Sequence, residues 1–349
     1  MKRWATIAFV SAYVVVLAGS IVRMSGAGMG CPDWPRCFGL TIPPTSEDQI
    51  RWQHSTVYGQ DRMLIERDTL WVAQCSHTSR TTFAADRISG LWAPNPTHNY
   101  AKFNATHTWI EFINRLSGAW AGIPATVLFI WSLFRAIRGR GDRRWKIAAW
   151  STLAWVLLLV VAWLGKLVVE GHLIPGSITI HMLGALGILI ALIFARQDIS
   201  IALSGRPSQA NFPSQVRLWL GLSTLLALFQ LVMGTQVREG VDLLVQAGVA
   251  RTDWLAELPS SWKLHRSFSW LLLVTNFAWI WPVWRGKPSG SFWHRGANAM
   301  SILLCAQIIT GLLFVWFAVP AWSQPLHLVM AMGLVLLGFS LWRSGYLAR

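Results

Sequence analysis

The stretch IAAWSTLAWVLLLVVAWLG, residues 147–165, runs for nineteen residues without a single charge. About 20 predominantly apolar residues are enough to cross a bilayer as a helix. A continuous apolar run of this kind is a helix, because a lipid-exposed backbone must satisfy its own hydrogen bonds. Similar runs recur along the chain and predict an all-α integral membrane protein. The eight predicted transmembrane helices are roughly 4–23, 109–134, 147–169, 176–196, 216–238, 262–282, 297–319 and 323–342.

The composition agrees with this fold class. Of the 349 residues 54% are hydrophobic and only 13% are charged, whereas soluble domains carry about 25% charged residues. The first segment resembles a signal peptide, but its apolar core is long. The sequence AGSIVRMSGAG after it also lacks a clean small-x-small cleavage site. We therefore interpret segment 4–23 as a transmembrane helix.

The net charge of +15 raises the question of a nucleic-acid partner. The loop 135–146, RAIRGRGDRRWK, holds six basic residues and one acidic residue. Further basic residues flank the other short loops on the same side and both ends of the chain, where Arg343 follows the last segment. The positive-inside rule makes this side cytoplasmic, together with both termini. These residues are interpreted as topology determinants beside anionic membrane lipid, and no nucleic-acid partner is expected.

On the opposite side, the loop 24–107 is too long to be a simple connection, so we expect it to fold over the membrane face as a lid. Cys31, Cys37 and Cys75 lie in this outer loop, where disulfides persist. Cys305 falls within an apolar segment and is interpreted as a small apolar filler.

The stretch GCPDWPRCFG, residues 30–39, separates Cys31 from Cys37 by six positions. A zinc site is disfavoured, because no second cysteine or histidine pair stands at ligand spacing. Two interpretations stay open: a short-loop disulfide beneath the lid, or a redox role in which the pair passes or senses thiol state. Cys75 is left over as a free thiol or an exchange partner.

The two halves of the chain contain matching motifs, which predict a repeated four-helix unit. GSIVR at 19–23 matches GTQVR at 234–238, NR at 114–115 matches HR at 265–266, and glycine precedes histidine by 16 positions at 165–181 and at 311–327. An even number of helices in each copy gives both copies the same orientation in the membrane. The predicted domains are an N-terminal half 1–196, a cytoplasmic linker 197–215 and a C-terminal half 216–349.

Three of the nine histidines, His181, His265 and His327, lie in the first turns of the fourth, sixth and eighth segments. An ionisable residue inside a transmembrane helix is a functional candidate, and the alternative is a hydrogen bond to a neighbouring helix. Histidines on facing helices are well placed to hold a heme from above and below. Heme is favoured over zinc because no acidic or thiolate ligand accompanies them. His265 and His327 are predicted to form a six-coordinate electron-transfer site.

The first half carries Asn114 where the second half carries His265. Asparagine ligates iron poorly, so His181 is expected to hold a heme alone or with another partner. His107, two helical turns before Asn114 on the same face, is a rival ligand. The hypothesis is that the half with asparagine binds the heme on which chemistry happens, because an activating site needs an open position. The alternative is that Asn114 merely bonds another helix.

Glu111 lies three residues before Asn114 and therefore on the same helix face. It is a candidate catalytic base or a stabiliser of a cationic intermediate, and the alternative is a salt bridge to Arg115. Arg115 and Arg266 each follow the ligand position of their half. Both are predicted to hold heme propionates or outer carboxylates, since arginine forms bidentate pairs with them.

Six stretches together resemble the heme A synthases of the cytochrome oxidase assembly pathway. They are GSIVRMSGAGMGCPDWPRCFG, WIEFINRLSGA, LGKLVVEGHLIPGSITIHMLGA, FQLVMGTQVREGVD, KLHRS and QPLHLVMAMG. The resemblance covers nearly the whole membrane part and does not extend to about 50–105. It implies eight helices in two pseudo-repeated four-helix bundles. It also implies oxidation of a methyl group of heme O to the formyl group of heme A by successive hydroxylation, with a heme b in the C-terminal half.

The resemblance also assigns residues. Its histidine ligands match His181, His265 and His327, while the fourth ligand falls on Asn114. Its essential glutamate matches Glu111. Its cysteine pair, which matches residues 31 and 37, implies a disulfide.

The implied partners are heme O synthase and cytochrome oxidase assembly proteins, beside membrane lipid and an unidentified electron donor or acceptor. One alternative function is a diheme b-type electron carrier that oxidises quinol, which should pair histidines in both halves. Another is a transporter or channel, which should place polar residues in mid-bilayer. A bacterial plasma membrane is expected rather than a mitochondrial inner membrane, because no Arg/Ser-rich presequence precedes the first segment.

Overall fold

The computed structural model describes residues 1–95, 103–141, 143–170, 176–205 and 213–347. The chain forms two compact units, which are described one at a time. We call the first the helical unit; it comprises Met1–Ser20, Gly118–Ala162 and Pro175–Arg349. We call the second the disulfide unit; it comprises Ile21–Ser117 and Trp163–Ile174.

All eight predicted segments are helices. They are α1 (Lys2–Ser25), α3 (Ala105–Arg138), α4 (Arg144–Glu170), α5 (Ser177–Ser204), α6 (Ser214–Gln246), α8 (Ser261–Gly286), α9 (Phe292–Trp316) and α10 (Ser323–Leu347). Within the described residues, seven are long and apolar enough to cross a membrane, and α8, which begins SWKLHRS, is not among them. The chain is thus a mostly helical, multi-pass membrane protein, and the eighth crossing stays a prediction.

Several helices continue beyond the predicted apolar segments. The helix α5 ends at Ser204, so the predicted linker 197–215 begins inside a helix, and α6 continues to Gln246. Apolar composition marks only the part of a helix that matches the hydrocarbon layer, whereas backbone hydrogen bonding continues into the polar turns beyond it. The connection after α6 contains only the short helices η3 (Arg251–Asp253) and α7 (Trp254–Glu257).

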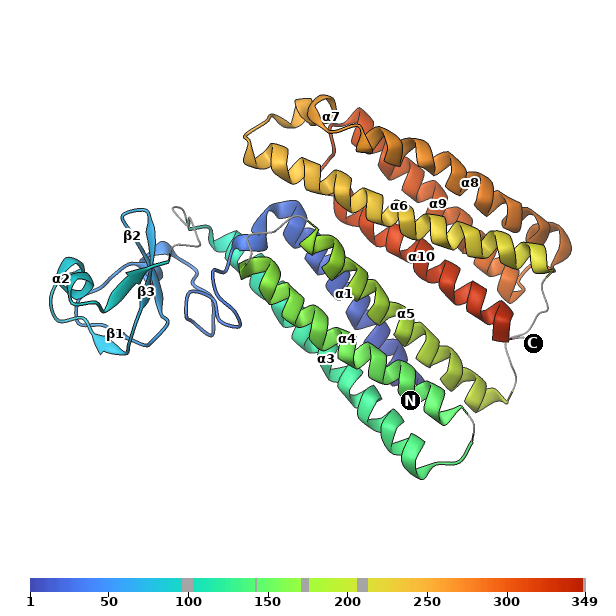
Figure 1. Ribbon diagram of the computed structural model, residues 1–349, viewed down its shortest axis with the longest axis horizontal. Helices are drawn as coiled ribbons and strands as arrows, with labels where there is room; N and C mark the ends of the chain where they lie inside the picture. The colour runs from blue at the N-terminus through green and yellow to red at the C-terminus, as the bar shows by residue number, and fades with distance from the viewer. Residues whose placement is uncertain (96–102, 142, 171–175, 206–212, 348–349) are drawn as a thin grey trace. The chain divides into compact units, whose positions relative to one another are not determined.

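Helices α6, α8, α9 and α10 pack around one apolar core in the helical unit (Figure 1). Its largest fully buried side chains include Leu220, Trp279, Trp293 and Met332. Residues of α5 also belong to this core, and α5 contacts both α6 and α10. The C-terminal half therefore packs as a four-helix group against α5.

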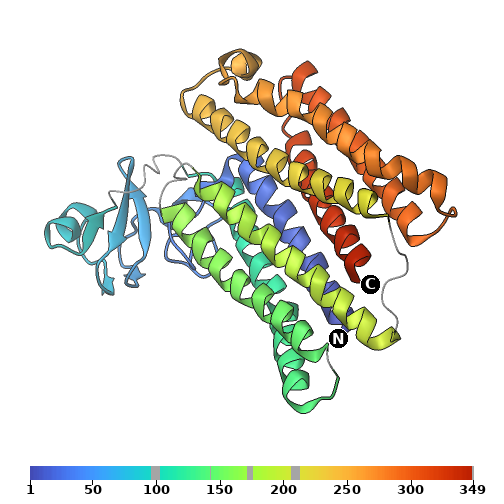
Figure 2. The same ribbon diagram turned by 45° about the vertical axis from the view of Figure 1, so that its right-hand side comes forward.

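A second core joins α1, α3, α4 and α5. It is rich in alanine, including Ala5, Ala8, Ala125 and Ala154, and small side chains let membrane helices approach closely. The Tyr13 hydroxyl of α1 donates to the Val329 carbonyl of α10 at 2.6 Å, which links the two helix groups. The start of α1 and the end of α10 lie at the same end of the helical unit (Figure 2).

At this end a buried carboxylate also ties the helices together. Asp198 of α5 is fully buried, and its oxygens accept from Arg343 of α10 at 2.6 Å and from Arg143 at 3.0 Å. Arg343 also donates to the Phe194 carbonyl at 2.8 Å. Arg343 is thus a buried ion-pair partner as well as a basic residue at the end of the last helix.

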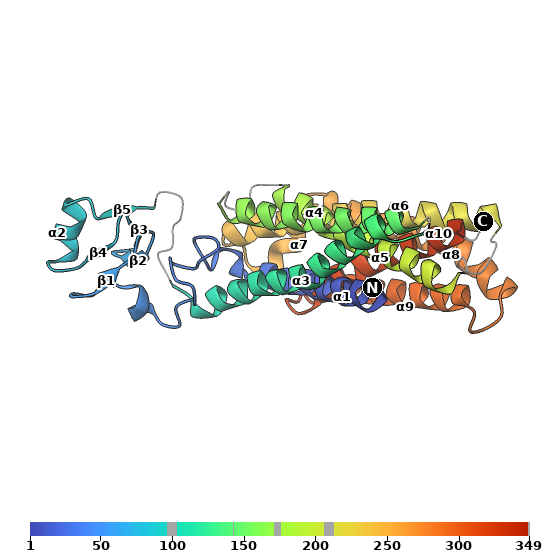
Figure 3. The same ribbon diagram turned by 90° about the horizontal axis from the view of Figure 1, so that it is seen from below.

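The disulfide unit contains a small β-region that the all-α prediction missed (Figure 3). The antiparallel strands β2 (Met63–Glu66), β3 (Thr69–Ala73) and β5 (Trp92–Pro94) form one sheet, and β1 (Val57–Tyr58) pairs with β4 (His77–Thr78). The short helices are η1 (Ala27–Met29), η2 (Glu47–Ile50) and α2 (Phe83–Ile88).

One face of this sheet packs on the cysteine loop. Met63, Ile65 and Leu70 share a buried cluster with Cys31 and Cys37. The long loop is therefore a folded module with its own core. The expectation that this module covers the membrane face as a lid stays a prediction.

Candidate functional site

Two predicted ligands of the second half, His265 and His327, face each other in the helical unit. His265 lies in the first turns of α8 and His327 in those of α10. Their ring centroids are 6.5 Å apart, at an interplanar angle of 65°. Two metal–nitrogen bonds of about 2 Å and two ring radii of roughly 1 Å each place centroids about 6 Å apart. The pair therefore fits a metal held between two imidazoles.

The two rings have different neighbours. Thr310 Oγ1 lies 2.7 Å from His327 Nδ1, which leaves Nε2 as the nitrogen available to a metal. The buried Nδ1 of His265 has no hydrogen-bond partner in the described part of the chain. Gln230 donates to the His265 backbone carbonyl at 2.5 Å. A Cβ added at Gly234 would lie 3.2 Å from His265 Cε1, so glycine lets α6 approach the ring.

No group of three or more His, Cys, Asp or Glu residues that would hold a metal ion occurs among the described residues. A heme, whose macrocycle already supplies four ligands, needs only one axial nitrogen above the iron and one below it. The spacing of His265 and His327 is compatible with two axial ligands of this kind.

His181 lies in the first turns of α5, also in the helical unit. Its buried Nδ1 has no hydrogen-bond partner among the residues that the structure describes. Two positions before it, Thr179 Oγ1 lies 2.7 Å from Thr235 Oγ1 and accepts from Gln236 Nε2 at 3.1 Å. These contacts anchor the start of α5 to α6.

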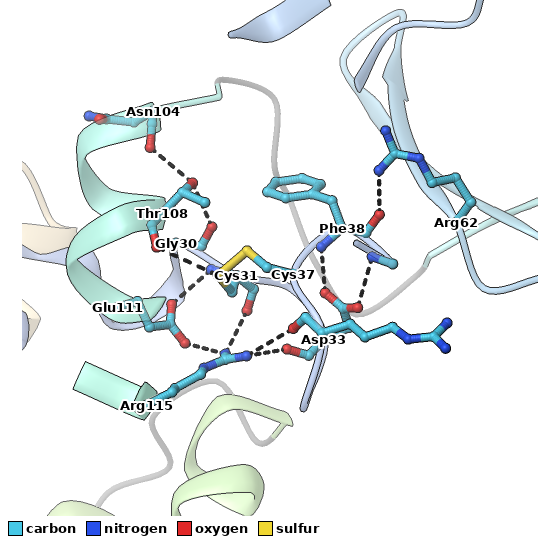
Figure 4. Close-up of a disulfide and its surroundings, with 12 residues drawn as sticks. Gly30, Cys31, Asp33, Cys37, Phe38, Arg62, Asn104, Thr108, Glu111 and Arg115 are labelled. Carbon is cyan, nitrogen blue, oxygen red and sulfur yellow. Dashed lines mark hydrogen bonds and ion pairs between the residues drawn. A yellow bond between two sulfur atoms is a disulfide. The ribbon is translucent and has the colours of Figure 1, made fainter. Parts of the chain in front are cut away.

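Cys31 and Cys37 form a disulfide in the second unit (Figure 4), which confirms the implied pairing. A Cβ added at Gly30 would lie 2.6 Å from the His107 carbonyl group, so only glycine fits where this loop crosses α3. The Thr108 hydroxyl lies 2.9 Å from the Gly30 carbonyl oxygen, to which it can donate. The disulfide loop is therefore packed directly on the start of α3.

Glu111 is 3% exposed and engaged at both carboxylate oxygens. One oxygen accepts from the Cys31 backbone N–H at 2.8 Å, and the other forms an ion pair with Arg115. Arg115 in turn donates to the backbone carbonyls of Asp33 at 2.5 Å, Arg36 at 3.1 Å and Cys31 at 3.2 Å (Figure 4). The salt bridge considered from the sequence is thus present, and it clamps the disulfide loop to α3.

Asp33 is a member of this site that the sequence analysis did not single out. Its carboxylate accepts from the backbone N–H groups of Phe38 at 2.6 Å and Gly39 at 2.9 Å. Burial raises the pKa of the Asp33 carboxyl, although these hydrogen bonds and the charge of Arg115 oppose the shift. The sequence signal that could have identified Asp33 is its place inside a short cysteine loop, because aspartate side chains readily accept hydrogen bonds from the backbone of turns.

Asn114 and His107 lie on the α3 segment of the disulfide unit. The buried Oδ1 of Asn114 has no hydrogen-bond partner in the described ranges. The structure thus brings Glu111 and Arg115 together at the cysteine loop. His181 belongs to the helical unit.

Arg266, the counterpart of Arg115, has different surroundings. Its side chain is exposed, and its guanidinium lies 5.0 Å from the centroid of the Trp262 ring. No ion pair involves Arg266 in the part of the chain that the structure describes. Its charge is therefore accessible to an anionic group, whereas that of Arg115 is neutralised.

The sequence is similar to several curated proteins. Heme A synthase of Methylobacterium sp. (strain 4-46) is 25% identical over 377 aligned positions, which cover 100% of this chain and 93% of the relative. Heme A synthase of Shewanella oneidensis is 36% identical over 66 residues, 19% of each chain. Heme A synthase of Bacillus licheniformis is 32% identical over 88 residues, which make up 24% of this chain and 29% of the relative.

The sequence profile of a family described as cytochrome oxidase assembly protein, COX15-CtaA, matches residues 2–63 and 95–339. The unmatched residues between these ranges contain β3, β4 and α2 of the disulfide unit. The match and these relatives identify an oxidoreductase of the heme A synthase type. The chain belongs to the COX15-CtaA family of cytochrome oxidase assembly proteins.

Proposed function

We propose that this protein converts the methyl group of heme O to the formyl group of heme A by successive hydroxylation. The observation that carries the proposal is the facing pair of His265 and His327 at 6.5 Å, which fits a resident heme. A relative that matches the whole chain is a heme A synthase, which supports the same reaction.

The proposed architecture is eight transmembrane helices in two pseudo-repeated four-helix bundles, one within residues 1–196 and one within 216–349. The positions of the three histidines support it: each stands four residues after the serine that begins its helix, Ser177 of α5, Ser261 of α8 or Ser323 of α10. A shared register of this kind is what a duplicated helical unit predicts.

The two halves have different proposed tasks. In the second half, His265 and His327 hold a heme b, which supplies electron transfer when it is bound. In the first half, His181 would hold heme O, and Asn114, which ligates iron poorly, would not serve as a strong second ligand. His107 is the alternative second ligand. The unpartnered Nδ1 atom of His181 is consistent with a ring whose orientation the protein fixes less firmly than that of His327.

Glu111 is the proposed catalytic carboxylate of the first half. Its ion pair with Arg115 and its bond to the Cys31 N–H hold the charge in one place, and a fixed charge stabilises a developing positive charge without reorganisation. Arg115 is committed to the cysteine loop. Arg266 is exposed and is the better candidate for binding heme propionates.

The proposed location is the bacterial plasma membrane, with both ends of the chain cytoplasmic. The basic loop 135–146 and the common end of α1 and α10 (Figure 1) support this orientation. The proposed partners are heme O synthase, oxidase assembly proteins and an electron donor or acceptor.

Purified protein tests the function through its visible spectrum and chromatography of acid-extracted heme. Heme A or a hydroxylated intermediate beside heme b is the expected result. Heme b alone, with no conversion of added heme O under reducing and aerobic conditions, indicates the quinol-oxidising carrier instead. Protein without any heme indicates the transporter or channel.

A further inference from the structure

We propose that Thr310 is a positioning residue for His327: its hydroxyl holds the proton on Nδ1, directs Nε2 toward His265 and sets the reduction potential of the heme between them. This inference rests on the proposed heme site. It concerns a residue of α9 that supplies no ligand, and it goes beyond the family reaction.

The geometry around the hydroxyl supports a defined direction of hydrogen bonding. Thr310 Oγ1 lies 2.7 Å from His327 Nδ1 and 3.0 Å from the carbonyl oxygens of both Ala306 and Gln307. A hydroxyl has one proton to donate and lone pairs to accept. When Nε2 of a neutral imidazole binds iron, Nδ1 carries the proton. Thr310 Oγ1 then accepts a hydrogen bond from Nδ1–H and donates its own hydroxyl hydrogen bond to a carbonyl of the preceding turn.

The surroundings hold this arrangement in place. Thr310 is 7% exposed, so water competes little for the hydroxyl. Phe314, one turn later on the same helix face, places its ring centroid 4.9 Å from that of His327. The face of α9 therefore supplies one hydrogen bond and one apolar wall to the imidazole, which restricts its rotation.

Neither of the other two histidines has this support. The buried Nδ1 atoms of His265 and His181 lack hydrogen-bond partners within the described residues. Thr310 comes directly before Gly311, 17 positions before His327. The residue at the same distance before His181 in the first half is Leu164. A leucine side chain cannot accept a hydrogen bond, so the two halves differ at the residue that could support the histidine.

A hydrogen bond from the distal ring nitrogen makes the imidazole a stronger donor to the metal and fixes its tautomer. Stronger donation stabilises ferric over ferrous iron and lowers the reduction potential. Loss of such a partner typically costs 10- to 100-fold in metal affinity. A tenfold loss of affinity for the ferric state alone raises the reduction potential of a one-electron couple by about 59 mV.

The test is a redox titration of the low-spin heme in purified wild-type, Thr310→Val and Thr310→Ser proteins. Valine keeps the branched shape and removes the hydroxyl, while serine keeps the hydroxyl and removes the methyl group. We expect the valine variant to retain a low-spin heme with a raised midpoint potential, and the serine variant to stay close to wild type. Heme loss from the valine variant alone also supports the proposal. An unchanged potential in the valine variant, or equal changes or equal heme loss in both variants, overturns it.

A second measurement does not depend on bound heme. Nitrogen-15 spectra of histidine-labelled, heme-depleted protein in lipid report which ring nitrogen carries the proton, and His327→Gln identifies the signal. The proposal expects Nδ1–H in wild type and Thr310→Ser, and a shift toward Nε2–H in Thr310→Val. The same tautomer in wild type and the valine variant refutes it. Wild-type protein without low-spin heme contradicts the heme site itself, and the tautomer spectra still decide the role of Thr310.

Discussion

The two halves of the molecule carry related motifs, but their polar residues have different contacts. In the second half, His265 and His327 face each other, and Arg266 is exposed. In the first half, Arg115 is tied to Glu111 and to carbonyls of the cysteine loop. The arginine is thus exposed in the second half and part of a structural clamp in the first.

The clamp depends on a loop that only the first half possesses. The disulfide between Cys31 and Cys37 presents its backbone carbonyls to Arg115 and one N–H to Glu111. The corresponding connection after α6 has no cysteine and instead contains α7, with Trp254 and Leu258 buried. The first half therefore has an outer support for α3 that the second half lacks.

The largest expected effect is the loss of the resident heme. His265→Ala or His327→Ala should remove the low-spin b-type signal or convert it to high spin, because one axial ligand is lost. Visible and electron paramagnetic resonance spectra check this, with His54→Ala in the disulfide unit as the control. Unchanged spectra in both ligand variants would exclude the pair as the heme site.

Glu111→Gln tests the clamp of the first half. Glutamine still accepts from the Cys31 N–H but removes the charge paired with Arg115. If Glu111 is catalytic, methyl oxidation should fall roughly 100- to 10,000-fold while heme content stays near normal. Glu47→Gln, in an exposed i,i+4 ion pair with Arg51, is the matched control. A purely structural clamp predicts the reverse pattern, with heme or protein lost and activity per heme retained.

Arg343→Met tests how firmly the halves are joined. It leaves the buried carboxylate of Asp198 with Arg143 as its remaining arginine partner, and breaking a buried ion pair costs about 3–5 kcal/mol. We expect a large loss of stability in denaturant titrations of protein in mixed micelles. Arg51→Met, which breaks an exposed pair, should cost at most about 1 kcal/mol. Equal losses in the two variants would show that the Asp198 cluster does not hold the halves together.

Gly234→Ala should disturb the surroundings of His265 without removing a ligand. The added Cβ lies 3.2 Å from His265 Cε1, so the ring must shift by a few tenths of an ångström. Overpacking of this kind costs about 1–3 kcal/mol and should change the low-spin spectrum. Gly122→Ala, whose Cβ meets Leu158 at an ordinary 3.9 Å, is the control. An unchanged spectrum in Gly234→Ala, or equal changes in both variants, would show that α6 does not shape this site.

The sequence predicted the helices well because apolar runs directly report the hydrocarbon layer. It also placed the three histidines in the first turns of α5, α8 and α10. The strands were missed because they contain only two to five residues, too few to show a period. The hairpin turn between β2 and β3 has Arg67 and Asp68 at φ 50° and 58°. The usual sequence signal of such a turn, Asn-Gly, is absent there.

The sequence also could not predict contacts between residues that lie far apart in the chain. The ion pair of Asp198 with Arg343 and the hydrogen bond of Thr310 with His327 join different helices. Helical periodicity reports which face of a helix a residue occupies, but not which neighbour that face meets. For Glu111, the sequence indicated a salt bridge to Arg115 as the alternative to a catalytic role. It could not reveal the hydrogen bond from the Cys31 N–H.

We propose that only the second half holds its heme with two histidines. The number of low-spin hemes per chain tests it most directly, in wild-type and Asn114→His proteins loaded with heme O and compared by quantitative electron paramagnetic resonance. We predict one bis-histidine low-spin center per chain in wild type and two in the variant, with slower turnover, because the new histidine closes the open position. Two such centers in wild type, or one in both proteins, would contradict the account.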